Sequence, residues 1–148
     1  MRNSNLLTTD VPTTARLLGW SGLIPFCALP LAMLWLPEHA ATAGEVLGYY
    51  AFGILCFLLG IWWGIGVMRG EPGVLLYSNG LFLVLFTARA LLGLSGFMLV
   101  AALLFIAVLL LERILPVFQR QPRYYAIMRS QLSLVAAASL LISGQVLS

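Results

Sequence analysis

The fold is decided by residues 74–111, VLLYSNGLFLVLFTARALLGLSGFMLVAALLFIAVLLL, in which Arg89 is the only charged residue. These thirty-eight residues are too many for one membrane-spanning helix without extreme tilt, because about 20 residues already cross the hydrocarbon core. Gly93-Leu94-Ser95-Gly96, near the middle, is a turn-prone break. The stretch therefore predicts two membrane helices joined by a tight hairpin.

The whole chain shares this apolar character. Of its 148 residues, 61% are hydrophobic and 9% are charged, whereas a soluble domain carries about 25% charged residues. The composition excludes a soluble domain, a disordered chain and a disulfide-rich secreted scaffold. It also excludes a nucleic-acid-binding domain with a basic face, so we expect no nucleic acid among the partners. The length predicts one domain, residues 1–148.

The charged residues leave five long uncharged segments, of 21, 23, 17, 22 and 19 residues. A helix rises about 1.5 Å per residue, so each segment can cross, or nearly cross, roughly 30 Å of hydrocarbon. Backbone groups must be paired in lipid and the segments lack the alternation of barrel strands, so helices are required. We predict an all-α polytopic membrane protein, a bundle of five transmembrane helices near residues 16–36, 46–68, 73–90, 94–115 and 124–147.

The arginine residues predict the orientation of these helices. With a cytoplasmic N-terminus, seven of the eight Arg residues fall on the cytoplasmic side and only Arg89 falls on the other. This positive-inside bias places the N-terminus in the cytoplasm and the C-terminus in the periplasm. Ala41-Thr42-Ala43 resembles a signal-peptide cleavage site. An uncleaved anchor is favoured, because the apolar stretch before it is longer than that of a signal peptide.

No motif predicts catalysis or metal binding. Gly93-Leu94-Ser95-Gly96 matches the GxSG of rhomboid-type intramembrane proteases, but the only His, His39, lies in the loop between the first two helices. A nucleophilic Ser needs a base within reach, so a hairpin turn is the favoured interpretation. Cys27 and Cys56 have no companions at metal-ligand spacing and are interpreted as small core residues. We expect no catalytic residue, no cofactor and no metal.

The second predicted helix carries a stripe of small residues, Gly53, Cys56, Gly60 and Gly64. Steps of three and four residues return to one helix face, and small residues let another backbone approach closely. We expect an internal helix contact at this stripe, with a homodimer or partner contact as the alternative. The last helix has a similar stripe, Ser130, Ser133, Ala137 and Gly144, and the two faces are candidates to meet.

Two prolines lie inside the first predicted helix. Pro25 and Pro30 each remove a backbone hydrogen bond, which leaves the carbonyls of Ser21 and Phe26 without their usual partners. Broken helices line some transport sites, but no acidic residue is buried beside these prolines. A proton- or sodium-coupled carrier would be expected to have one.

The segment from Glu112 to Arg129 is rich in arginine and aromatic residues. Near a membrane surface each Arg attracts anionic lipid by about 1 kcal/mol. The candidate contacts for lipid head groups are Arg120, Arg123, Tyr124 and Arg129. The alternative is that these arginines only set the topology.

Three short segments in a fixed order carry a family resemblance. They are Leu23-Ile24-Pro25-Phe26, Phe57-Leu58-Leu59-Gly60-Ile61-Trp62-Trp63-Gly64, and Gln121-Pro122-Arg123-Tyr124-Tyr125 leading to Arg129. From about residue 15 to 145 the chain resembles the family called domain of unknown function 3429. These are small bacterial inner-membrane proteins similar to the mitochondrial transmembrane protein 69 of animals. The resemblance implies a five-helix, multi-pass protein of the bacterial inner membrane and no established activity.

These observations favour a non-enzymatic accessory or assembly component that contacts other membrane proteins or lipids. The predicted loops are too short for a catalytic domain, and the predicted helices hold no charge away from their ends, so no ion path is visible. The alternative function is a small transporter or channel, with an oligomer formed around the first-helix prolines as one arrangement. An intramembrane enzyme is the third interpretation.

Overall fold

The computed structural model describes residues 11–119 and 122–148, and this part of the chain is helical. Its elements are α1 (Val11–Ser21), α2 (Ile24–Trp35), η1 (Pro37–His39), α3 (Ala40–Arg69), α4 (Pro72–Leu91), α5 (Leu94–Ile114), η2 (Pro116–Phe118) and α6 (Arg123–Val146). Five helical stretches are long and apolar enough to cross a membrane, with α1 and α2 together forming the first of them.

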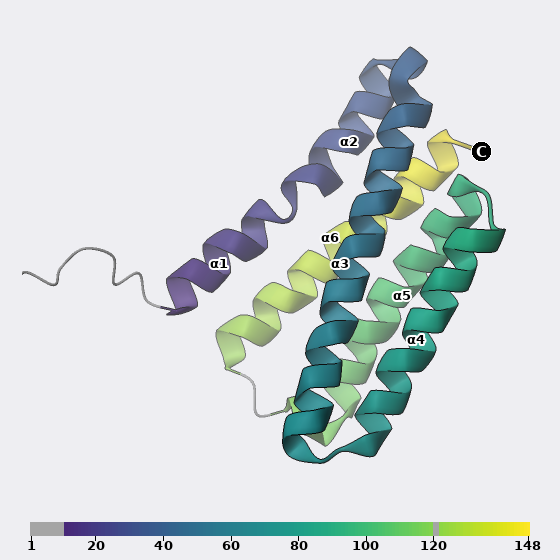
Figure 1. The fold of residues 1–148 in the computed structure, drawn as a ribbon. Helices are drawn as coiled ribbons and strands as arrows, with labels where there is room; N and C mark the ends of the chain where they lie inside the picture. The colour runs from purple at the N-terminus through teal and green to yellow at the C-terminus, as the bar shows by residue number, and fades with distance from the viewer. Residues whose placement is uncertain (1–10, 120–121) are drawn as a thin grey trace, which may run out of the picture.

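The long helices run alternately up and down one bundle (Figure 1). The α2–α3 and α4–α5 turns lie at one end, together with the C-terminus. The α3–α4 turn and the α5–α6 connection lie at the other end (Figure 1). The first span, α1 and α2 together, packs mainly against α3 and α6. This alternation is the arrangement that five successive spans require.

The helix boundaries follow the predicted ranges closely in the second half of the chain. The hairpin expected between residues 90 and 94 is present, with α4 ending at Leu91 and α5 beginning at Leu94. Two expectations need correction. The first helix is broken at Gly22 and Leu23 instead of running continuously, and α3 begins at Ala40 instead of near residue 46. The early start reflects the helix-favouring segment Ala40-Ala41-Thr42-Ala43.

The two prolines explain why the first span bends, and side chains from other helices supply hydrogen bonds at the bend. Pro25 lies in the first turn of α2, where a missing N–H costs little, so the chain restarts a helix there. The Tyr50 hydroxyl donates a hydrogen bond of 2.9 Å to the Gly22 carbonyl at the break. Pro30 frees the Phe26 carbonyl, as expected, and the Ser139 hydroxyl of α6 donates to it at 2.5 Å. Side chains of α3 and α6 thus supply hydrogen bonds to two of the carbonyls at the bend, those of Gly22 and Phe26.

Replacing Ser139 with Ala is expected to lower the free energy of unfolding by about 1–3 kcal/mol. The buried Phe26 carbonyl would then lose its partner in an apolar environment. Thermal unfolding in detergent measures the change. Ser21→Ala is the matched control, because the exposed Ser21 hydroxyl bonds only within its own helix, to Leu17. Equal effects of the two variants would contradict the role given to Ser139.

The centre of the bundle is α5. Phe97, Ala101, Phe105 and Val108 recur at helical spacing along it, and each is at most 2% exposed. Large apolar side chains also cover the outside of the bundle, including Leu17, Phe57, Leu76, Leu103 and Leu110. An apolar core beneath an apolar surface suits a protein surrounded by lipid.

The glycine stripe of α3 does not make the expected internal contact. A Cβ added at Gly53, Gly60 or Gly64 would meet nothing within 4 Å. That prediction is wrong for these three residues, because their face of α3 points out of the bundle. Helices approach closely at other glycines: a Cβ at Gly66 would lie 2.9 Å from Leu75.

The α6 stripe packs against a different helix from the one expected. Gly144 faces Ser95 and Met98 of α5, and Ser133 and Ala137 are buried. The two small-residue stripes therefore do not meet. A contact of the outward-facing α3 stripe with a second copy or a partner stays a prediction.

Candidate functional site

A buried ion pair joins α5 and α6 near the end of the bundle that holds the α5–α6 connection. The Glu112 and Arg129 side chains are each 9% exposed. Arg129 Nη2 lies 3.0 Å from Glu112 Oε1, and Arg129 Nε lies 3.2 Å from Oε2. The indole N–H of Trp62 on α3 donates to Oε1 at 2.9 Å. Side chains of two helices, α3 and α6, thus donate to the carboxylate of a third, α5.

Helical spacing explains why these charges face inward. Arg129 is followed at steps of four, three and four residues by Ser133, Ala136 and Leu140, and all four residues are buried. Arg129 therefore occupies the core-facing stripe of α6 rather than the membrane surface. A buried guanidinium requires a counter-charge, and Glu112 supplies it.

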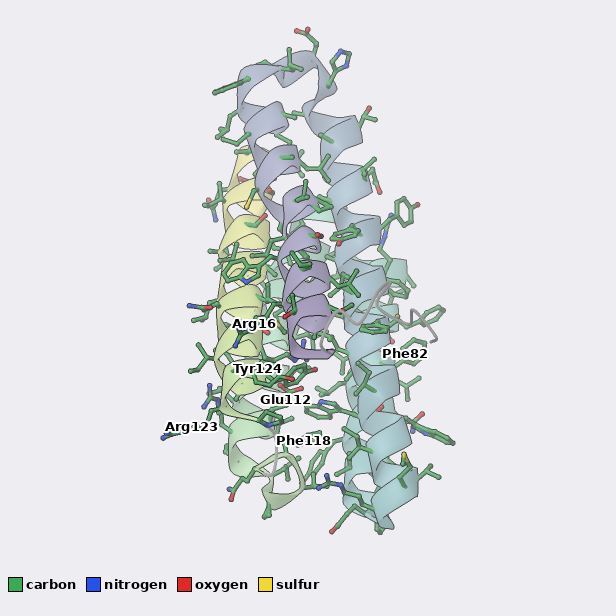
Figure 2. All side chains as sticks on the ribbon, turned by 90° about the vertical axis from the view of Figure 1, so that its left-hand side faces the viewer. Arg16, Phe82, Glu112, Phe118, Arg123 and Tyr124 are labelled. Carbon is green, nitrogen blue, oxygen red and sulfur yellow. The ribbon has the colours of Figure 1, made fainter. Side chains whose placement is uncertain are left out.

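Beside this pair lies a pocket of about 270 Å³ between α5, η2 and α6, lined by both charged and apolar residues. We call it the cationic pocket; its lining residues are Leu109, Glu112, Arg113, Phe118, Gln119, Arg123, Ala126 and Arg129. Arg113 donates to the Ala126 carbonyl at 3.3 Å and to the Ser130 hydroxyl. Figure 2 shows Glu112, Phe118 and Tyr124 in the lower part of the bundle, with Arg123 at its edge.

The cationic pocket has an excess of positive charge. Its described lining carries three guanidinium groups and one carboxylate, and that carboxylate is already paired with Arg129. Among the described residues, the ion pairs are Glu112–Arg129 and Glu45–Arg89, so Arg113 and Arg123 have no acidic partner there. The positive N-terminal end of α6, which begins at Arg123, adds to the attraction for an anion.

The floor of the pocket is fixed by contacts to α3. The Phe118 ring packs on Trp62 with 4.9 Å between ring centroids. Arg69, in the last turn of α3, donates to the Val117 carbonyl at 2.7 Å. These two contacts hold η2, and with it Gln119, against the bundle.

A second cavity of about 320 Å³ lies on the other side of Arg129, between α1, α2, α3 and α6. We call it the apolar crevice; its lining includes Leu18, Phe26, Phe57, Ile61, Met128, Arg129 and Leu132. Arg129 lines both cavities. Arg129 thus lies between the cationic pocket and the apolar crevice.

The predicted head-group contacts lie in different environments. Arg123 is exposed and lines the cationic pocket. Tyr124 is half-buried, and its ring lies 5.1 Å from the guanidinium carbon of Arg16. Arg129 lies in the buried ion pair instead of at the surface, which corrects its interpretation as a simple surface contact. Arg120 lies outside the described residues. The sequence did not predict Arg113 as a site residue. In the sequence Arg113 is one more arginine at the end of a predicted helix, and such an arginine is equally expected if it only sets the topology.

The GxSG segment begins the α5 helix. The Ser95 hydroxyl donates to the Gly144 carbonyl at 3.0 Å and joins α5 to the end of α6. His39 is exposed in η1, between α2 and α3. Of the GxSG segment, only Gly93 therefore lies in the hairpin turn, and Leu94, Ser95 and Gly96 form the first turn of α5, so the turn is shorter than the predicted one.

Arg89 lies at the opposite end of the bundle from the cationic pocket. In the last turn of α4, it forms a 2.7 Å ion pair with Glu45 of α3. Its guanidinium carbon also lies 4.7 Å from the Tyr49 ring centroid and 5.6 Å from that of Phe97. Arg89 therefore ties α3, α4 and α5 together beside the hairpin.

The fold and this site define a class: helical bundles with five candidate membrane spans, a buried Arg–Glu pair and a cationic pocket at one end. The chain matches the family described as "Protein of unknown function (DUF3429)" over residues 11–144, and it belongs to that family. The resemblance inferred from the sequence is thereby confirmed. The match includes every described residue of the cationic pocket. No solved structure matches the chain.

Proposed function

We propose that the protein is a non-enzymatic, multi-pass accessory or assembly component of the bacterial inner membrane that holds anionic lipid in the cationic pocket. The observation that carries this proposal is the pair Arg113 and Arg123, which line one cavity without an acidic partner in the described chain. Basic pockets between membrane helices are suited to lipid head groups.

The position of the pocket supports a lipid ligand. Arg113 lies in the last turn of α5 and Arg123 at the start of α6, so both guanidinium groups are at the ends of candidate spans. Head groups lie at that level of a bilayer. The excess of arginine at the same end supports a cytoplasmic side for the pocket, with the N-terminus in the cytoplasm and the C-terminus in the periplasm.

A small transporter or channel is the alternative function. The break between α1 and α2 is the feature that favoured it. Tyr50 and Ser139 donate to the Gly22 and Phe26 carbonyls there, so each of these two carbonyls has a hydrogen-bond partner within the bundle. This pairing supports a structural role for the bend. Flux of a labelled solute into liposomes containing the purified protein decides between the two functions, and the accessory proposal predicts none.

Native mass spectrometry of the detergent-purified protein tests lipid binding. We expect anionic phospholipid to remain bound to the wild type and to be largely lost from the double variant Arg113→Gln/Arg123→Gln. Arg16→Gln is the matched control, because Arg16 lies next to Tyr124 (Figure 2), the residue that follows Arg123, but does not line the pocket. Equal lipid retention by the double variant and the wild type would contradict the proposal.

A further inference from the structure

We infer that the cationic pocket selects a lipid whose head group is a phosphate monoester, such as phosphatidic acid, over lipids with phosphodiester head groups. This inference rests on the proposed function and specifies its ligand. Its basis is the charge of the pocket and the position of two arginines in its lining, Arg113 at the end of α5 and Arg123 at the start of α6.

The charge of the pocket matches a dianion. Three guanidinium groups and one carboxylate give the described lining a net charge of +2. A phosphate monoester carries about −1.5 to −2 charges near neutral pH, whereas a phosphodiester such as phosphatidylglycerol carries one. The Arg129 charge is neutralised by Glu112 at 3.0 Å, so the two remaining charges belong to Arg113 and Arg123.

The geometry favours one phosphate over two separate ones. Arg113 reaches α6 at Ala126 and Ser130, and Arg123 is one helical turn before Ala126 on that helix. Both side chains line the same cavity. A terminal phosphate presents three strong acceptor oxygens, and guanidinium groups bind phosphate in a bidentate manner. A diester offers only two such oxygens, because the others are esterified.

The pocket also has an apolar side. Leu109 and Phe118 line it together with the arginines, and both belong to elements that continue into the bundle core or pack on it. A ligand whose phosphate lies at Arg113 and Arg123 can therefore direct its glyceride portion toward apolar side chains. A soluble phosphate ester gains nothing from this apolar wall, and so we assign the phosphate to a lipid.

The charge argument predicts a dependence on pH. The second pKa of a phosphate monoester is roughly 6, so acidification removes the second negative charge from the ligand. The charged groups that face the pocket are Glu112 and Arg113 from α5 and Arg123 and Arg129 from α6, and Arg69 of α3 lies beside η2. A guanidinium group stays charged at any working pH. Weaker binding of the lipid in acid would therefore indicate that the ligand is a phosphate monoester, which loses its second negative charge there.

The test compares lipids in nanodiscs of zwitterionic phospholipid. Equal fractions of phosphatidic acid, phosphatidylglycerol or cardiolipin are added, and the bound lipid is measured by native mass spectrometry after release. We expect about tenfold preference for phosphatidic acid over phosphatidylglycerol at about pH 8, and a smaller preference at about pH 5. Arg123→Lys keeps the charge but not the bidentate geometry, and it should lose most of the preference while the unfolding temperature stays unchanged.

The outcomes separate this inference from the proposed function. A wild type that retains anionic lipids without preferring the monoester would overturn the inference and leave the proposed function standing. Stronger retention of cardiolipin than of phosphatidic acid would overturn it too, in favour of two diester phosphates. Displacement of phosphatidic acid by millimolar glycerol 3-phosphate would overturn the assignment to a lipid. Retention of no anionic lipid at all would defeat both proposals.

Discussion

Replacing Glu112 with Leu is expected to lower the free energy of unfolding by about 3–5 kcal/mol, because the variant leaves the Arg129 guanidinium buried without a counter-charge. Among the described residues, Arg129 forms an ion pair with no other carboxylate, and the Arg129 side chain is 9% exposed. The Trp62 indole N–H would lose its acceptor as well. The effect should exceed that of any other single substitution considered for this protein.

A double-mutant cycle identifies the cause of that loss. Replacing both charges, as in Glu112→Leu/Arg129→Met, removes the uncompensated charge, and pairs replaced by apolar residues are often neutral in stability. We therefore expect the double variant to be more stable than Glu112→Leu alone when both are unfolded thermally in the same detergent. If the second substitution adds to the damage of the first, the two residues do not act as a pair.

The second large effect is expected at Gly66. An Ile side chain there would overlap Leu75, because the Cβ alone would lie 2.9 Å from Leu75 Cδ2 and 3.4 Å from the Glu71 carbonyl. Overpacking of this kind costs about 1–3 kcal/mol. Gly66→Ile should therefore lower the unfolding temperature by separating α3 from α4, which pack closely along their length.

The matched control is Gly60→Ile, six residues earlier on α3. A Cβ at Gly60 meets nothing within 4 Å, so the stability change should stay within about 0.5 kcal/mol. A control that unfolds as readily as Gly66→Ile would contradict the outward orientation of the glycine stripe. If Gly60→Ile instead changes the oligomeric size in detergent, the stripe is the partner contact that the sequence left as an alternative.

The architecture could be predicted because it depends on the lengths of apolar segments. The hairpin between α4 and α5 follows from the length of the stretch 74–111 and its break at Gly93. Membrane helices must satisfy their own backbone hydrogen bonds, so segment length fixes the number of spans with little help from tertiary contacts. The order of short motifs also sufficed to identify the family.

The internal contacts could not be predicted in the same way. A stripe of glycines shows that one helix face is small, but it does not show whether that face points inward, and Gly60 and Gly64 point out. The bond from Ser139 to Phe26 joins residues 113 positions apart, and no local pattern signals it. The proline rule predicted that the Phe26 carbonyl would need a partner, while only the packing of α6 determines which residue supplies it.

The candidate site was recognised in part. Arg123 was predicted as an anion contact from its charge, and it lines the cationic pocket. Arg129 was grouped with it, although its step of four residues to Ser133 places it on the buried face of α6. The charge of the arginines predicts only that the ligand is an anion. Helical phase and the position of Glu112 decide which arginine remains available for it.

We propose that the cationic pocket lies at the cytoplasmic surface of a five-span protein, and thiol labelling tests this orientation most directly. Gln119 beside the pocket and Glu38 at the other end are both exposed. Each is replaced by Cys in a Cys27→Ala/Cys56→Ala background. With a membrane-impermeant maleimide, we predict that Glu38→Cys reacts in intact spheroplasts and that Gln119→Cys reacts only in inside-out vesicles. Reaction of Gln119→Cys in intact spheroplasts would contradict the account.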